Sequence, residues 1–426
     1  MKMKSKGKTG LPFMMMVAIL VMNGMYVNAQ DWAQWRGANR DGVSKEAGLN
    51  LDWATSKPAL TWVYRQAGAG FSAPVIVGTT LYGQGAAGGS DFAFAIDTQT
   101  GNQKWKQNLG KQSVLERGDG PRGSVTVDGD KLYLVRGDGQ IHCLSAADGK
   151  MIWQKDFKDD FGGKMMSQWG YSESPLIDGN LVVCTPGGSQ GTLVALDKST
   201  GALVWACQEW TDDAGYSSPI IAEVGGIRQY IQQSAKGVAG VAAKDGKLLW
   251  KINNAAYRTA VIPTPIFSDN MVYVTNGYNG GCMGIMLSKE GEGIKAENVY
   301  ANRNMDNQHG GVVLINGKLY GYTETQYWVC QDFKTGEIVW RERPDGVRKG
   351  SVIAVNDRLL CFDMQNGTLA VAAASPDGWK EFGRMTIPER TKISTQDNQL
   401  WTHPVVANGK LYLRDHDLLF CFDLKK

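Results

Sequence analysis

Aromatic, cationic and imidazole side chains recur just before the short apolar strands that this sequence predicts. Flat aromatic faces suit sugars or a planar ring, and Arg122, Arg258 and Lys349 suit carboxylates on a ligand. If the strands surround a central channel, the residues that precede them converge at one of its ends. We therefore expect a ligand-binding site made of Phe71, Arg122, Trp169, Tyr171, Glu173, Tyr216, Arg258, His309, Lys349, Trp401 and His403. The alternative is that these side chains only fill the channel and solvate its mouth.

Two members of this set, Glu173 and His309, are candidates for catalysis. His309 precedes two glycines, where the backbone can approach a ligand closely, so it is a candidate general base or polar anchor. The competing interpretation is a histidine whose ring is satisfied by neighbouring carbonyls. Because the chain has only four histidines, a multi-histidine metal site is not expected and no metal ligand is assigned.

A fixed spacing organises the chain around these residues. Six stretches carry a small residue, a Gly six positions later and an aromatic four positions after that; they begin at Ala95, Cys143, Ala195, Gly240, Cys330 and Ala372. A spacing that recurs about every 40 to 50 residues is typical of a repeat architecture, in which each unit buries its apolar face against the next.

Each repeat predicts four short antiparallel strands, which is one blade of a β-propeller. Asp128-Gly129 and Asn408-Gly409 are examples of the hairpin turns between alternating apolar runs. We therefore predict an all-β, eight-bladed propeller, with an insertion from Ser288 to Tyr300 in the fifth blade. Its first strands begin at Ser72, Gly123, Ser174, Ser218, Thr264, Gly311, Ser351 and Pro404.

The last blade ends after its third strand, so a fourth strand has to come from elsewhere in the chain. We predict that residues 60–64, which include Trp62, supply it and close the ring of residues 59–426. The aromatic-rich extension from 30 to 58 is expected to pack on one face of the propeller.

Residues 1–29 have the charged, apolar and small-residue regions of a secretory signal peptide. The apolar run from Leu11 to Met22 is too short to span a membrane, which takes about 20 residues. Cleavage after Ala29 removes four lysines from a chain of net charge +3 and leaves about −1, which does not favour a nucleic-acid partner. We expect a monomeric protein that is periplasmic or secreted, with no membrane span once the signal is removed.

Seven cysteines in an exported chain raise the question of disulfides. Cys143, Cys330 and Cys421 occupy the small-residue position of the repeat, so we interpret them as buried packing thiols. Cys184, Cys207, Cys282 and Cys361 are open to either interpretation, and one pair among them can be oxidised.

At this spacing, the repeats resemble those of the pyrroloquinoline-quinone (PQQ)-like propellers, with their tryptophan docking motif. The resemblance covers residues 60–426, and the segments 32–37 and 169–175 resemble an exported bacterial subgroup. It implies an eight-bladed propeller, but the family contains both PQQ-dependent alcohol dehydrogenases and the outer-membrane assembly factor BamB. The dehydrogenases hold PQQ between a Trp and a vicinal disulfide, beside a Ca²⁺ ion. This chain has no adjacent cysteines and no haem attachment motif, and its sequence shows no matching cluster of acids and amides.

These observations favour a non-catalytic binding or scaffold module, with a glycan, a small planar ligand or a protein partner at the channel mouth. The alternative is an alcohol or sugar dehydrogenase that uses PQQ and Ca²⁺. A third hypothesis is a hydrolase or lyase that uses Glu173 and His309.

Overall fold

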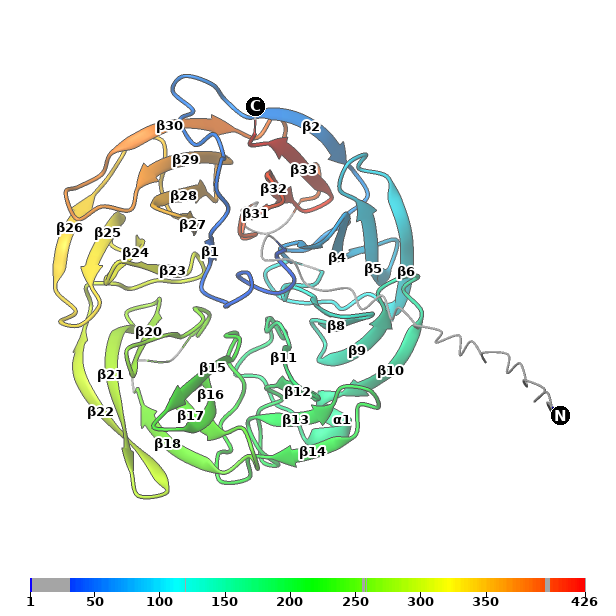
Figure 1. Cartoon of the computed structure of the whole chain (residues 1–426), viewed down its shortest axis with the longest axis vertical. Helices are drawn as coiled ribbons and strands as arrows, with labels where there is room; N and C mark the ends of the chain where they lie inside the picture. Colours follow the sequence, from blue (N-terminus) through cyan, green and yellow to red (C-terminus); the bar gives the residue numbers. More distant parts are fainter. Residues whose placement is uncertain (2–30, 119, 255–256, 258, 395–398, 426) are drawn as a thin grey trace.

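Short strands and tight turns build eight sheets that surround a central axis (Figure 1). The computed structural model describes residues 1, 31–118, 120–254, 257, 259–394 and 399–425. The expected signal peptide, 1–29, and Arg258 lie outside the described residues, apart from Met1. The prediction of an all-β, eight-bladed propeller of four-stranded antiparallel blades is confirmed.

The first four blades are consecutive antiparallel meanders. Their strands are β3 (Val75–Val77), β4 (Thr80–Ala87), β5 (Ser90–Asp97) and β6 (Gln103–Lys111); β7 (Thr126–Asp128), β8 (Lys131–Val135), β9 (Gln140–Ser145) and β10 (Met151–Asp156); β11 (Leu176–Asp178), β12 (Leu181–Cys184), β13 (Val194–Asp197) and β14 (Leu203–Ala206); β15 (Ile220–Val224), β16 (Ile227–Ser234), β17 (Gly237–Ala242) and β18 (Leu248–Asn253).

Blades five to seven continue the same pattern, and blade seven carries the extra inner strand β1 (Val43–Ser44), parallel to β27. Their strands are β19 (Ile266–Ser268), β20 (Met271–Asn276), β21 (Gly281–Glu290) and β22 (Gly293–Asn302); β23 (Val312–Ile315), β24 (Lys318–Thr323), β25 (Tyr327–Asp332) and β26 (Ile338–Glu342); β27 (Gly350–Val355), β28 (Arg358–Asp363), β29 (Thr368–Ala373) and β30 (Glu381–Thr386). The described part of the chain has one short helix, α1 (Phe157–Phe161), and no helix there is long and apolar enough to cross a membrane.

Blade eight is made from both ends of the described chain. Its three C-terminal strands are β31 (Val405–Ala407), β32 (Lys410–Asp415) and β33 (Leu418–Asp423), and β2 (Ala59–Tyr64) pairs antiparallel with β33. Trp62 lies opposite Cys421 in this pairing. Because β2 fills the outer position, β33 is paired on both sides.

The outer-strand aromatic of one blade lies against the Gly turn of the next. Trp105 sits opposite Ala95 within its own blade, and its Nε1 donates to the Ala146 carbonyl of blade two at 3.1 Å. A Cβ atom on Gly149 would lie 2.7 Å from the Trp105 ring. The small residue makes room for the ring inside its blade, and the glycine makes room for it on the neighbour.

The hydrogen bond from the outer-strand indole to a carbonyl of the next blade recurs around the ring. Trp62 donates to the Thr98 carbonyl at 3.0 Å, Trp153 to that of Lys198 at 3.0 Å, and Trp340 to that of Ser375 at 2.9 Å. In blade five the expected insertion lengthens the β21–β22 hairpin. Tyr300 stands there opposite Gly284, against Gly336 of blade six.

All seven cysteines are buried, with free thiols. Cys143, Cys330 and Cys421 stand opposite Trp153, Trp340 and Trp62 in the strand register. In these positions they pack beneath an aromatic ring.

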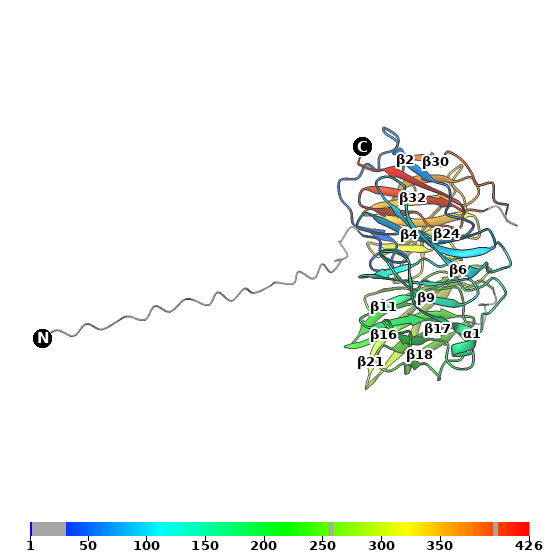
Figure 2. The ribbon, with the colours of Figure 1, turned by 90° about the vertical axis from the view of Figure 1, so that its right-hand side faces the viewer.

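The segment before β2 crosses the channel from one face of the ring, which Figure 2 shows edge-on. Trp32 pairs with Ile76 of blade one through two backbone hydrogen bonds of 2.9 Å, and the Ala33 carbonyl accepts from Val127 of blade two. On the far side, Trp35 Nε1 donates to Thr264 Oγ1 of blade five at 2.8 Å.

Two arginines of this segment, both with positive φ, donate to backbone carbonyls in or just before inner strands. Arg36 Nη2 donates to the Val312 carbonyl of blade six, and Arg40 Nη2 to the Ser174 carbonyl of blade three, both at 2.6 Å. The Glu46 carboxylate then accepts from the backbone of Asn408 and Gly409 in blade eight, both at 2.7 Å. The segment therefore closes one end of the channel and ties distant blades together.

Replacing Trp205 by Ala is expected to lower the free energy of unfolding by about 3 kcal/mol, the usual cost of deleting a buried large aromatic. Trp205 is 8% exposed, stacks on Tyr230 and lies against Gly246 of blade four. Chemical denaturation monitored by circular dichroism measures the change. Leu203→Ala on the same strand is the control, since Leu203 is 51% exposed and its loss is expected to cost about 0.5 kcal/mol or less. Equal effects of the two substitutions would contradict this account of the contact between blades.

Candidate functional site

The end of the channel away from the Asn408-Gly409 turn contains a cavity of about 330 Å³. Its wall comes mainly from the loops that precede each inner strand, and these loops lie at the end of the strand opposite to the following turn. This volume is within the usual range of small-molecule sites, ~300–1,000 Å³. Trp35 of the N-terminal segment also lines the cavity.

The structure brings most of the expected site residues to this cavity. Those that line it are Phe71, Arg122, Trp169, Tyr216, His309, Lys349, Trp401 and His403. Tyr171 does not line it: the residue is buried against Phe157, and its hydroxyl donates to the Pro186 carbonyl at 2.9 Å. Glu173 does not line it either, and its Oε1 accepts from the Thr185 backbone at 2.6 Å.

Other lining residues were not predicted from the sequence: Trp35, Arg117, Ser172, Ser174, Ser218, Ile262, Tyr278, Gln308, Met364 and Gln399. Tyr278 and Met364 belong to loops between the second and third strands of their blades. In a four-stranded meander these loops lie at the same end as the loop before the first strand. Strand order alone therefore provides a signal for these two, whereas no repeat signal marks Trp35.

Aromatic rings line the cavity at steep angles to one another. Phe71 and Trp401 have ring centroids 4.7 Å apart and planes 40° apart, and Trp35 meets His403 at 4.7 Å and 63°. Trp169 and Tyr216 stack on each other, with centroids 5.8 Å and planes 30° apart. The cavity therefore offers several separate aromatic faces.

Three cations line the cavity, and none of the described lining residues is Asp or Glu. The guanidinium carbon of Arg122 lies 5.5 Å from the centroid of the Phe71 ring, and that of Arg117 lies 5.7 Å from the centroid of Trp169. Lys349 Nζ pairs with Glu324 Oε1 at 3.1 Å. The residues that line the wall therefore favour an anionic group on a ligand.

Two neutral imidazoles complete the wall. His403 Nε2 lies 2.9 Å from the His309 carbonyl; because a carbonyl only accepts, Nε2 carries the hydrogen. Burial, with the charge of Arg36, lowers the pKa of His403 to about 3. Burial, with the charge of Lys349, also lowers the pKa of His309 well below its ordinary value. Neither His309 ring nitrogen has a hydrogen-bond partner among the described residues.

A family model described as outer membrane protein assembly factor BamB matches residues 92–342. The chain belongs to this family. BamB of Yersinia pestis is 26% identical over 228 residues, which cover 50% of this chain and 53% of that protein. A quinoprotein ethanol dehydrogenase of Pseudomonas aeruginosa is 27% identical over 199 residues, which cover 43% of this chain and 28% of the enzyme. The chain thus spans about half the length of the first relative and less of the second.

The crystal structure of BamB from Moraxella catarrhalis superposes with a TM-score of 0.60 at 15% identity, covering 87% of this chain and 98% of that one. At this identity the likeness shows the fold alone. The BamB-like fold is therefore common to a protein named for assembly and to dehydrogenases, and the lining of the cavity has to decide between them.

The calcium ion of the dehydrogenases does not fit this lining. Ca²⁺ takes six to eight oxygen ligands, carboxylates among them, whereas the described wall contributes three cations and no carboxylate. Within the described residues, no group of three or more His, Cys, Asp or Glu side chains is placed to hold a metal ion.

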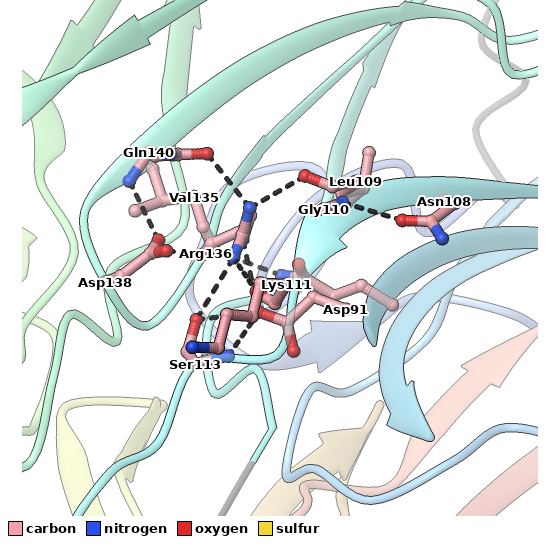
Figure 3. Close-up of polar contacts among 11 residues, drawn as sticks. Asp91, Asn108, Leu109, Gly110, Lys111, Ser113, Val135, Arg136, Asp138 and Gln140 are labelled. Atoms are coloured by element: carbon pink, nitrogen blue, oxygen red, sulfur yellow. Dashed lines mark hydrogen bonds and ion pairs between the residues drawn. The ribbon is translucent and has the colours of Figure 1, made fainter. Parts of the chain in front are cut away.

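A buried network holds the loop that carries Arg117 and Arg122 (Figure 3). Arg136 is 3% exposed, and its Nε contacts Asp91 Oδ2 at 3.1 Å. Its Nη1 donates to the Leu109 carbonyl at 2.7 Å and its Nη2 to the Lys111 carbonyl at 2.6 Å. Arg136 thereby ties the start of the loop to blade two.

Arg136→Met is expected to lower the free energy of unfolding by about 3–5 kcal/mol, because it leaves the buried Asp91 carboxylate without its cation. Adding Asp91→Leu should recover part of the loss. Lys150→Met is the control: Lys150 pairs with Asp148 on the surface, where such pairs contribute about 0–1 kcal/mol. Denaturant unfolding of the wild type and the three variants measures these differences. If Arg136→Met costs no more than the control, the network does not stabilise this loop.

Glu173 predicts a pH dependence of stability. Burial raises its pKa from 4.5 to about 7, although the hydrogen bonds of Thr185 and the charge of Arg40 lower it. Since the folded state binds the proton more tightly, this group stabilises the fold below pH 4.5, and its contribution is lost as the pH rises to about 7. Glu173→Gln cannot titrate and should lack this loss, so the difference in stability between wild type and variant should change with pH by up to about 3 kcal/mol, at ~1.4 kcal/mol per pKa unit. Unfolding measured at pH 5, 6, 7 and 8 tests it, and parallel curves would contradict it.

Proposed function

We propose that this chain is an exported, non-catalytic binding module that holds a small ligand in the cavity at the open end of its channel. The observation that carries the proposal is the wall itself, which combines separate aromatic faces, cations and the unpaired ring nitrogens of His309. The N-terminal segment closes the other end of the channel, so the site is a pocket with one entrance.

Several features of the proposal extend the sequence predictions. The protein is exported by its signal peptide, residues 1–29, and acts as a monomer in the periplasm or outside the cell. The contacts of the outer-strand aromatics with neighbouring blades agree with tryptophan docking. A rigid ring of this kind presents loops in fixed positions, which suits ligand recognition.

The geometry gives less support to the catalytic hypotheses. Glu173 is buried behind the wall while His309 lines it, so the two do not face one cavity as a shared acid and base would. The dehydrogenase alternative is kept as an outcome of the test, because relatives with that activity match part of the chain.

Thermal unfolding in the presence of sugars, sugar acids and planar aromatic acids tests the proposal. A ligand at 100 times its dissociation constant stabilises the folded state by about 2.7 kcal/mol, so it should raise the melting temperature. Ile262→Trp, which fills the cavity, should abolish this shift, and Ile152→Trp on the exposed outer strand should leave it intact. A shift that persists in Ile262→Trp would place the ligand elsewhere. Saturable binding of PQQ with Ca²⁺, together with dye reduction by an alcohol or sugar, would favour the dehydrogenase.

A further inference from the structure

We propose that the ligand of this cavity is an acidic sugar, a pyranose ring that bears a carboxylate, such as the hexuronate of an oligosaccharide. The inference rests on the proposed function, since it names the ligand class of the same site. Three properties of the wall carry it: the angles between its aromatic rings, its neutral hydrogen-bonding groups and the sign of its charges.

The aromatic rings offer separate faces to a ligand, and they do not form a parallel pair with space for a flat ligand between them. Phe71 and Trp401 are inclined by 40°, Trp401 and His309 by 51°, and Trp35 and His403 by 63°. Trp169 and Tyr216 are closer to parallel, but they stack on each other and leave no space between them. A flat polycyclic ligand is best held between two parallel faces. A pyranose needs one aromatic face for its C–H groups, and its hydroxyls point outward around its edge.

The polar groups on the wall match such an edge. Ser174 Oγ accepts from the Ser124 backbone at 2.8 Å and Ser218 Oγ from the Ser174 backbone at 2.9 Å, so each hydroxyl still has its hydrogen to donate. His309 is the third group. A neutral imidazole offers one donor and one acceptor, and hydroxyls supply both partners.

His309 is half-buried, and its two ring nitrogens are buried and unpaired, which is unfavourable until something binds them. His309 is therefore the polar group on this wall that gains most from a ligand with hydroxyls. An apolar ligand would leave its nitrogens unsatisfied, and an ammonium group could pair with only one of them.

The charges of the wall determine the sign of the ligand. Arg117, Arg122 and Lys349 line the cavity, and no acidic residue does so among those described. Lys349 already contacts Glu324, and its ammonium has three hydrogens, so it can bind a second carboxylate without losing the first. A carboxylate is thus the substituent that distinguishes the preferred sugar from its neutral counterpart.

Matched pairs of sugars test the inference by isothermal titration calorimetry. Digalacturonate is compared with galactobiose, and cellobiouronate with cellobiose, so that each pair differs only in the carboxylates. We expect at least one acidic sugar to bind about tenfold tighter than its neutral partner, which is the scale of one charge-assisted hydrogen bond. Because the charges are partly exposed, this preference should shrink as sodium chloride is raised.

Variants then assign the two parts of the site. Lys349→Gln should remove most of the preference for the acidic sugar and leave the neutral affinity within about twofold, whereas Trp401→Ala should weaken both sugars. Lys244→Gln on an exposed turn is the control for a lost positive charge and should match the wild type. The comparison of paired sugars on the wild-type chain does not depend on any variant folding.

Each of the other outcomes would refute a specific part of the inference. Equal affinities within both pairs would remove the carboxylate from the inference. Saturable binding of PQQ or of a planar aromatic acid, with no binding of either hexuronate, would refute the sugar and leave the binding module standing. No binding of any of these probes to a folded chain would refute the acidic sugar, while the wider ligand search of the thermal test would still decide the binding module.

Discussion

The ring depends on one contact, an aromatic side chain of an outer strand lying on the glycine turn of the next blade. A single blade has two apolar faces and cannot bury either alone, so its stability comes from its neighbours. The indole of Trp105 covers Gly149, which buries apolar surface. Its N–H also donates to a carbonyl of the next blade, which fixes the orientation of the ring. Where the last contact is made, Trp62 performs the same role from the other end of the chain. The ring closes without an exposed edge on β33, because β2 pairs with that edge.

The N-terminal segment provides hydrogen-bond donors for carbonyls that face the channel. Inner strands have one edge that faces the channel, and carbonyls on that edge lack partners within the blade. Arg36 donates to one of them, the Val312 carbonyl, and Arg40 donates to the Ser174 carbonyl just before the inner strand of blade three; both side chains are buried. Burial lowers the pKa of both arginines, yet carbonyl dipoles surround the guanidinium groups. The same crossing converts a through-channel into a pocket, since Trp35 becomes part of its wall.

The sequence was most informative where the structure is periodic. The spacing from Ala195 to Trp205 reports a contact between neighbouring blades that recurs around the ring, so it predicted the sheets, the turns and the ring. Loops do not repeat, and there the predictions were mixed. In the segment from Trp169 to Glu173, Trp169 lines the cavity whereas Tyr171 and Glu173 turn behind it. Gly170, between the two aromatics, has a φ of 79°, and spacing alone does not reveal whether each aromatic lies on the cavity side of the wall or behind it. Trp35 was missed because its position depends on contacts with Thr264, more than two hundred residues away.

This division between framework and loops explains why membership in the BamB-like family leaves the ligand open. The blade contacts need only small residues, glycines and aromatics, and they are indifferent to what the loops carry. Calcium chemistry would require carboxylates at the channel mouth, and the described wall has cations in their place. Under the proposed function, loop side chains such as His309 and Lys349 select the ligand, and Lys349 also pairs with Glu324 of the neighbouring blade six.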